Sequence, residues 1–211
     1  MINNTDNRLI ATIIRNSIVP ALDTVLSDNQ NGFRKRRATH SNINFFNDRF
    51  YGNLEEGKFY DILFVDFCKA FDSISHDAIF KLIECLGFDT GYTNIIKSLF
   101  QNAYCFSNNT RNSTIQFNSG VKQGCPLSPT LFIAIADVLI DMLEKVAKVE
   151  VKFYADDAAI GSEDIIPKLP IIKECFDIFA DFTGLILNPS KSAVIATGGR
   201  SSLRTALDEA G

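Results

Sequence analysis

Two apolar segments of the chain have the pattern of buried strands. Phe59–Phe67 is a nearly continuous apolar run that includes an acid, Asp66, at its carboxyl end, which is typical of a strand buried on both faces. Val151–Ile160 alternates apolar and polar residues around Asp156 and Asp157, which predicts a tight hairpin. Shorter strands are predicted at 115–117, 185–187 and 192–196.

Other segments carry apolar residues at the spacing of helices, with suitable residues at their ends. Gly52, Gly87 and Gly184 each follow such a segment and are expected to end it. Ser128 and Pro129 predict a helix start, with serine as the cap and proline in the first turn. The predicted helices cover 7–26, 41–51, 77–86, 92–105, 128–143 and 168–182.

This irregular order of helices and strands predicts an α+β fold, in which helices cover one face of an antiparallel sheet. A chain of 211 residues, 46% hydrophobic and 22% charged, suits one large domain or two small ones that share a core. The longest apolar stretch, Leu131–Leu143, contains Asp137 and Asp141 and is too short to span a bilayer. We expect no membrane association.

Cysteine usage and the N-terminus favour an intracellular protein, in the cytoplasm, the nucleus or both. The five cysteines are odd in number and lack a C-x-x-C spacing, so neither a disulfide framework nor a zinc knuckle is predicted. Residues 1–6 are polar and do not resemble a signal peptide. The formal net charge of -4 does not favour nucleic-acid binding, although residues 34–37 form a dense basic run in a loop.

Three acids lie at positions where burial and like charges would make an ionised carboxylate unfavourable. Asp156 and Asp157 are adjacent inside an apolar hairpin, and Asp66 ends an apolar strand; like charges repel and burial raises the cost. An exposed hairpin turn would also accommodate Asp156 and Asp157. Alternatively, three carboxylates from two strand ends converge on Mg²⁺, which prefers oxygen ligands. Two such ions about 3.5–4 Å apart assist in-line attack on a phosphoryl group.

Five motifs, in order, resemble those of reverse transcriptases of the non-LTR retrotransposon and group II intron type. The most specific are Val65–Asp72, similar to the DFSKAFD motif, and Tyr154–Asp157, identical to the YADD box. The others are Gly32–Thr39 (GFRKRRAT), Gly120–Pro129 (GVKQGCPLSP) and Gly184–Lys191 (GLILNPSK). Together they cover residues 28–198.

The resemblance implies a right-hand polymerase palm with part of the fingers and no thumb. The palm is expected at 59–73 and 128–198, the fingers at 1–58 and 74–127, and a truncated tail at 199–211. By resemblance, Asp66, Asp156 and Asp157 are catalytic and bind two Mg²⁺ ions, for which Mn²⁺ is a possible substitute. The backbone carbonyl of Phe67 would complete a metal shell.

The resemblance also implies a nucleotide pocket. Phe71 would lie under the sugar, where its ring excludes a 2′-hydroxyl and selects dNTPs. Gln123 and Gly124 would line the pocket, because glycine allows close approach and glutamine both donates and accepts hydrogen bonds. Lys191 would lie near the leaving pyrophosphate.

Contacts to template phosphates are expected from Arg34, Lys35 and Arg37. Arg36 departs from the family pattern, because it replaces a glycine and arginine tolerates positive φ poorly. For His40, His76 and Cys125 we expect packing or surface roles, since no His/Cys cluster is present.

The resemblance predicts RNA-templated addition of dNMP to a DNA primer. The fingers arginine, the primer grip and the thumb fall outside this sequence, so we expect the 211-residue chain alone to extend a primer poorly. The full protein is expected to carry those parts and an endonuclease or other retroelement domain. One alternative is an incompetent or domesticated fragment that acts as a binding module. An RNA-dependent RNA polymerase is disfavoured by Phe71 and by YADD.

Overall fold

A computed structural model describes residues 5–101, 104–106, 114–116 and 118–197. The chain forms two compact units, which are described separately. We call the first the helical unit (Met1–Leu26, Lys69–Ile135 and Phe182–Gly184) and the second the sheet unit (Ser27–Cys68, Ala136–Asp181 and Leu185–Gly211). The predicted boundaries of palm and fingers differ from this division and stay a prediction.

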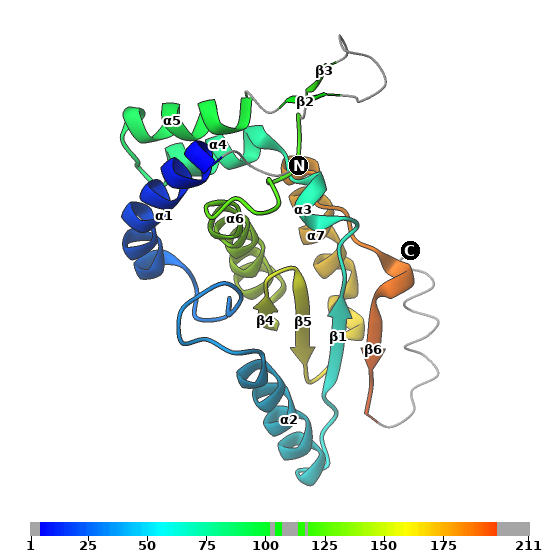
Figure 1. Ribbon diagram of the computed structural model, residues 1–211. Helices are drawn as coiled ribbons and strands as arrows, with labels where there is room; N and C mark the ends of the chain where they lie inside the picture. The colour runs from blue at the N-terminus through cyan, green and yellow to red at the C-terminus, as the bar shows by residue number, and fades with distance from the viewer. Residues whose placement is uncertain (1–4, 102–103, 107–113, 117, 198–211) are drawn as a thin grey trace. The chain divides into compact units, whose positions relative to one another are not determined.

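The sheet unit contains a four-stranded antiparallel sheet in the order β4-β5-β1-β6 (Figure 1). The strands are β1 (Asp61–Val65), β4 (Glu150–Tyr154), β5 (Asp157–Ser162) and β6 (Ala193–Ile195). β4 and β5 form the hairpin predicted for Val151–Ile160. The mixed antiparallel fold expected from the sequence is confirmed.

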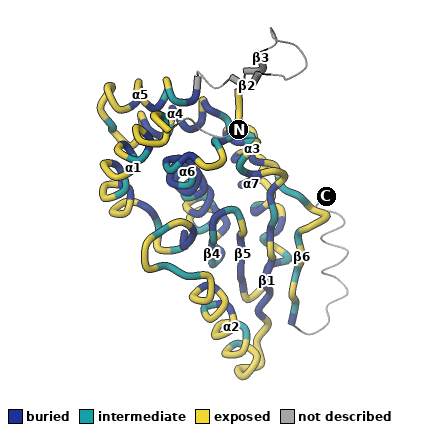
Figure 2. Tube along the Cα trace, in the orientation of Figure 1, coloured by how far each residue is buried: buried dark blue, intermediate teal, exposed yellow. Residues whose placement is uncertain are grey.

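One face of this sheet holds the main core of the unit. Alternate residues of β4 and β5 are buried there, Val151, Phe153, Ala158 and Ile160, because successive side chains of a strand point to opposite faces. Helix α7 (Leu169–Thr183) covers this face, and its Phe176 ring lies 6.0 Å from that of Phe67. In Figure 2, β4 alternates between buried and intermediate residues, and β5 is mostly buried.

Helix α2 (Thr39–Glu55) packs against one end of the opposite face. Its Phe46 forms a small cluster with Tyr60 and Ile62, while most of the helix is exposed (Figure 2). The predicted helix end at Gly52 is wrong. The helix continues to Glu55, and the chain turns at Gly57 with φ of +70°, because glycine is tolerated inside a helix whose apolar face is packed.

One other sequence prediction needs correction in the sheet unit. Residues 185–187 are not a strand, since only Leu187 forms an isolated bridge, to Phe67. The unit also contains short turns of other helix types: a π-helix (Leu143–Ala147) and 3-10 helices (Ile166–Lys168 and Pro189–Lys191).

The helical unit is built from α1 (Thr5–Val25), α3 (Ala70–Ser73), α4 (His76–Cys85), α5 (Thr90–Gln101) and the start of α6 (Ser128–Met142). The helix expected over 92–105 is too long, because 104–106 belong to strand β2 (Tyr104–Phe106), which pairs with β3 (Thr114–Gln116). Phe117, the end of the predicted strand, lies outside the described residues, as does the whole of the predicted tail, 199–211.

Helix α6 begins at Ser128 as predicted, but not through the serine cap. The buried hydroxyl of Ser128 has no hydrogen-bond partner in the structure. Among the described residues, none of the helices has the length and apolarity needed to cross a membrane.

Candidate active site: a carboxylate edge and a nucleotide loop

The three predicted acids lie in the sheet unit, where β1 and the β4–β5 hairpin reach the same edge. The register pairs Val65 with Ala158, so Asp66 and Asp157 are the next residues of two neighbouring strands. Asp157 in turn pairs with Tyr154 across the hairpin. The two turn residues are therefore Ala155 and Asp156, rather than the two acids. We call Asp66, Asp156 and Asp157 the carboxylate edge.

The electrostatics of the carboxylate edge indicate that these acids interact. Burial raises the pKa of Asp157 above its ordinary value, and the neighbouring charges of Asp156 and Asp66 raise it further. Like charges disfavour the ionised form of a carboxyl group, and a cation would reverse that effect. The raised pKa thus marks a place where positive charge is favourable.

Lys191 and Asn188 both lie beside Asp66. Asn188 Nδ2 donates a hydrogen bond to Asp66 Oδ2 at 3.2 Å, and Lys191 Nζ lies 3.7 Å from the same oxygen. Both come from the chain around the 3-10 turn Pro189–Lys191, which is held to β1 because Asn188 N donates to Asp66 O. The structure thus brings Lys191 to the predicted acids.

The donor set of the carboxylate edge fits a hard divalent cation, because all its side-chain ligands are oxygen atoms. Phe67, whose carbonyl was assigned to the metal by resemblance, directly follows Asp66. Within the described part of the chain, however, no group of three or more His, Cys, Asp or Glu side chains is arranged to hold a metal ion. The metal-binding roles of these residues stay predictions.

Three of the predicted nucleotide residues, Phe71, Gln123 and Gly124, lie in the helical unit, where Phe71 is beside the loop 118–127. Val121 N donates to Phe71 O at 2.7 Å, and Gly120 N donates to Ile74 O at 2.7 Å. The Phe71 ring stacks on Phe132 with centroids 4.5 Å apart. In this loop, which we call the nucleotide loop, Gln123 and Gly124 are exposed.

His76, for which the sequence predicted packing, is buried and supports the nucleotide loop. Its Nε2 lies 2.8 Å from Gly120 O, and its ring contacts that of Phe100 edge-on. Burial lowers the pKa of His76, which favours a neutral ring near pH 7. Lys122 also has an internal role, because its ammonium donates to Leu99 O and burial lowers its pKa.

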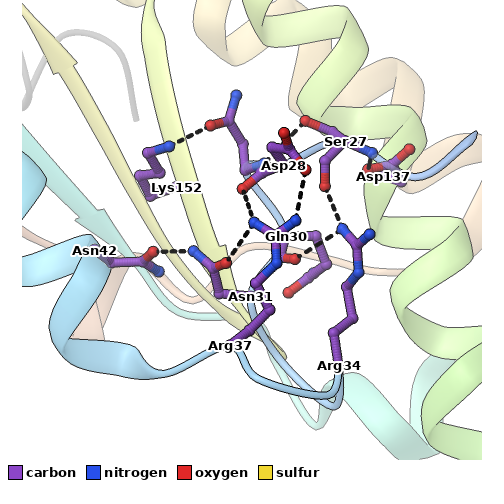
Figure 3. Close-up of polar contacts among 10 residues, drawn as sticks. Ser27, Asp28, Gln30, Asn31, Arg34, Arg37, Asn42, Asp137 and Lys152 are labelled. Carbon is purple, nitrogen blue, oxygen red and sulfur yellow. Dashed lines mark hydrogen bonds and ion pairs between the residues drawn. The ribbon is translucent and has the colours of Figure 1, made fainter. Parts of the chain in front are cut away.

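The basic run has structural contacts that its composition did not reveal (Figure 3). Arg34 Nη1 donates to Ser27 O at 2.6 Å and to Gln30 O at 3.3 Å. Arg37 forms an ion pair with Asp28 at 2.5 Å and lowers the pKa of that carboxyl. Both guanidinium groups thus stabilise the fold of loop 27–38, and their contact with template phosphates stays a prediction.

Arg36, in contrast, is exposed and takes φ of 62°. The left-handed conformation expected for the glycine at this position is therefore adopted by an arginine. Lys35, the third residue assigned to template phosphates, is also exposed.

The sequence did not reveal that this same loop lies beside the β4–β5 hairpin. Gln30 and Phe153 form a parallel bridge. Phe153 N donates to Asn29 O at 2.8 Å, and Asn31 N donates to Phe153 O at 2.9 Å. Residues 29–31 thereby extend the sheet beyond β4.

Comparison with known proteins agrees with the motifs. The model of the family "Reverse transcriptase (RNA-dependent DNA polymerase)" matches residues 1–203. A Pol polyprotein from the type-1 retrotransposable element R2 of Popillia japonica is 30% identical over 213 residues, which covers 94% of this chain and 30% of that protein. An uncharacterized 149 kDa protein of the Xenopus laevis transposon TX1 is 24% identical and covers 92% of this chain and 16% of that protein.

Solved structures show the same fold at low sequence identity. Telomerase from Candida tropicalis, solved with a fragment of telomeric RNA, matches with a TM-score of 0.70 at 13% identity, over 88% of this chain and 33% of that one. Telomerase from Candida albicans, also solved with such a fragment, gives 0.66 at 14% identity, over 91% and 34%. The chain spans less than a third of the R2 and TX1 relatives.

Proposed function

This chain belongs to the reverse transcriptase family, and from that premise we propose that it is the catalytic core of a non-LTR retrotransposon reverse transcriptase. The proposed reaction is template-directed transfer of dNMP to the 3′-hydroxyl of a DNA primer, with release of pyrophosphate. The template is RNA, and DNA is a possible second template. The observation that carries the proposal is the carboxylate edge, where Asp66, Asp156 and Asp157 meet at one end of the sheet.

Reverse transcriptases generally use divalent metal ions, and we propose that this chain uses two Mg²⁺ ions. Asp66 and Asp156 would hold them, with Asp157 beside them and the Phe67 carbonyl completing a shell. Bound Mg²⁺ supplies positive charge to the phosphoryl group and the attacking oxygen. Burial raises the pKa of Asp157, and the charges of Asp156 and Asp66 raise it further; this supports the proposal, because a cation would relieve the repulsion between the three carboxylates.

Lys191 would act on the leaving pyrophosphate. Its ammonium is mostly exposed, with 70% of its side chain accessible, and lies 3.7 Å from Asp66. Once Asp66 binds a cation, Lys191 would be released to offer charge, or a proton, to the departing phosphate oxygens.

Phe71 and the nucleotide loop would select the sugar and the base pair. The ring of Phe71 is fixed against Phe132, so it has little freedom to move away from a 2′-hydroxyl. The exposed side chain of Gln123 can both donate and accept hydrogen bonds. Lys35, Arg34 and Arg37 would contact phosphates of the template with little sequence preference.

A primer-extension assay tests the proposal. This chain and a longer chain that contains it are each given an RNA template with a DNA primer, dNTPs and Mg²⁺. We expect dNMP incorporation by the longer chain, inhibition by EDTA, and loss of activity in Asp156→Asn. The exposed acid Asp48 of α2 provides a control, since Asp48→Asn should keep full activity. Extension that survives Asp156→Asn, or that needs no divalent metal, would contradict the proposal.

A further inference from the structure

The hairpin turn at the carboxylate edge has an unusual backbone. Ala155, between Tyr154 and Asp156, takes φ of 59° and is only 8% exposed. A residue with a Cβ atom is disfavoured in this left-handed region. Such conformations persist where neighbouring groups fix them, and they gather at functional sites. The turn therefore needs a support that holds Ala155.

Gln30 supplies that support. Its side chain is fully buried, and its Oε1 accepts hydrogen bonds from Ala155 N at 3.3 Å and from Gly32 N at 2.8 Å. Its Nε2 donates to Ala155 O at 3.4 Å. One primary amide thus contacts both polar backbone groups of Ala155, which requires a side chain that both donates and accepts.

The loop around Gln30 also fits tightly against the turn. A Cβ atom added at Gly32 would lie 2.0 Å from Ala155 N, so only glycine permits this approach. On the other side of Gln30, the backbone of Asn29 and Asn31 bonds to Phe153. Gln30 is therefore held both through its side chain, at Ala155 and Gly32, and through the backbone of its two neighbours.

We propose that Gln30 is a positioning residue for the catalytic turn. By fixing both backbone groups of Ala155, it sets the direction of the Asp156 and Asp157 side chains that follow. Replacing Gln30 should therefore weaken cation binding at the carboxylate edge, and not only lower the stability of the fold. This inference rests on the proposed function only in assigning the cation site to these acids; the contact with Ala155 stands by itself.

Two variants of Gln30 test this inference against a matched control. Gln30→Met keeps the length of the side chain and removes all three hydrogen bonds, whereas Gln30→Glu keeps the acceptor and loses the donor. The control is Asn42→Ala. Asn42 is also buried and its Nδ2 donates to Phe153 O at 3.1 Å, so it supports the same strand without touching Ala155.

The first measurement is the affinity for Mn²⁺ alone, read from the free-ion signal in electron paramagnetic resonance. Partners that orient metal ligands typically change affinity by about 10- to 100-fold when removed. We expect such a loss in Gln30→Met, a smaller loss in Gln30→Glu, and none in Asn42→Ala. Equal Mn²⁺ affinity in Gln30→Met and wild type would overturn the proposal, because a purely structural Gln30 would change stability alone.

The second measurement is hydrogen exchange of the Ala155 amide, which does not depend on metal or activity. We expect its exchange to become at least about 10-fold faster in Gln30→Met but not in Asn42→Ala, because only the first loses its acceptor. Unchanged exchange in Gln30→Met would show that Gln30 does not hold the turn.

If wild type binds Mn²⁺ no better than Asp156→Asn, the assignment of the metal site fails, and the exchange rate of the Ala155 amide still decides the role of Gln30. Should Gln30→Met not fold, the Mn²⁺ affinity of Gln30→Glu gives the decision, because this variant loses the donor to Ala155 O: a loss of affinity is expected, and an affinity equal to wild type would overturn the proposal.

Discussion

The carboxylate edge and the nucleotide loop are built from different parts of the polypeptide. The carboxylate edge consists of charged side chains: burial and the charges of Asp156 and Asp66 raise the pKa of Asp157, and Lys191 pairs with Asp66. The nucleotide loop is held mainly by backbone hydrogen bonds, such as Val121 N to Phe71 O. The first region should therefore be sensitive to changes of charge, and the second to changes of backbone conformation.

The largest expected effect is on the charges of the carboxylate edge. Asp66→Asn keeps the size of the side chain but removes a charge, so dNMP incorporation in the primer-extension assay should fall at least about 10²- to 10³-fold. Gln123→Ala in the nucleotide loop should lower dNMP incorporation by much less, since Gln123 carries no charge and is exposed. If Asp66→Asn and Gln123→Ala lowered the single-turnover rate equally, the expected difference in charge sensitivity between the two regions would be wrong.

A change of backbone should affect the nucleotide loop instead. Gly120 has φ of +85°, and a Cβ atom there would lie 2.8 Å from Asp72 O. Gly120→Ala should lower the free energy of unfolding by about 2–5 kcal/mol, through backbone strain of about 1–2 kcal/mol and overpacking of about 1–3 kcal/mol. Urea denaturation measures this loss.

Gly57→Ala is the matched control for Gly120→Ala. Gly57 has φ of +70° but nothing within 4 Å of an added Cβ atom, so it should show the strain alone, about 1–2 kcal/mol. Equal losses at the two positions would mean that the close approach of Gly120 to Asp72 does not contribute.

Phe71→Ala should relax the selection of the sugar. Removing the ring gives space to a 2′-hydroxyl, and an overpacking penalty of about 1–3 kcal/mol corresponds to a roughly 5- to 150-fold gain in rNTP over dNTP use. The ratio of kcat/KM for rNTP and dNTP measures it. Phe80→Leu, a change at a buried ring of the same unit, should lower stability and leave this ratio unchanged. Unaltered selectivity in Phe71→Ala would make Phe71 a packing residue only.

The smallest expected effect is at Arg36, where a residue other than glycine adopts φ of 62°. Arg36→Gly should raise the free energy of unfolding by about 0.5–1 kcal/mol, because relief of backbone strain exceeds the entropy cost of glycine. Lys35 next to it is equally exposed but is not among the residues with positive φ. Lys35→Gly should therefore destabilise the chain, and a gain there would contradict this explanation.

The sequence predicted the parts of the site that depend on local pattern. The apolar run placed Asp66 at the end of a strand, and the alternation around Asp156 and Asp157 placed these two acids in a hairpin. The motifs added Lys191. Gly52 was misread as a helix end, because the packing of Phe46 in α2 that continues the helix is not local.

The support of the β4–β5 turn by Gln30 could not be predicted in the same way. Gln30 lies 125 residues from Ala155 in the chain. In addition, the loop that extends the sheet is polar, so its sequence has no periodic spacing of apolar residues from which a strand could be predicted. Likewise, the internal bonds of Arg34 and Arg37 depend on how the loop folds back on itself. A basic run in the sequence does not distinguish such contacts from contacts to phosphate.

The most direct test of the account is whether the carboxylate edge holds two cations together. Mn²⁺ is added to the chain with a primed RNA template and a dNTP, and electron paramagnetic resonance records the coupling between bound ions. The account predicts a coupled pair about 3.5–4 Å apart, which is lost in Asp156→Asn and kept in Asp48→Asn. Isolated ions without coupling, or a coupled pair that survives Asp156→Asn, would contradict it.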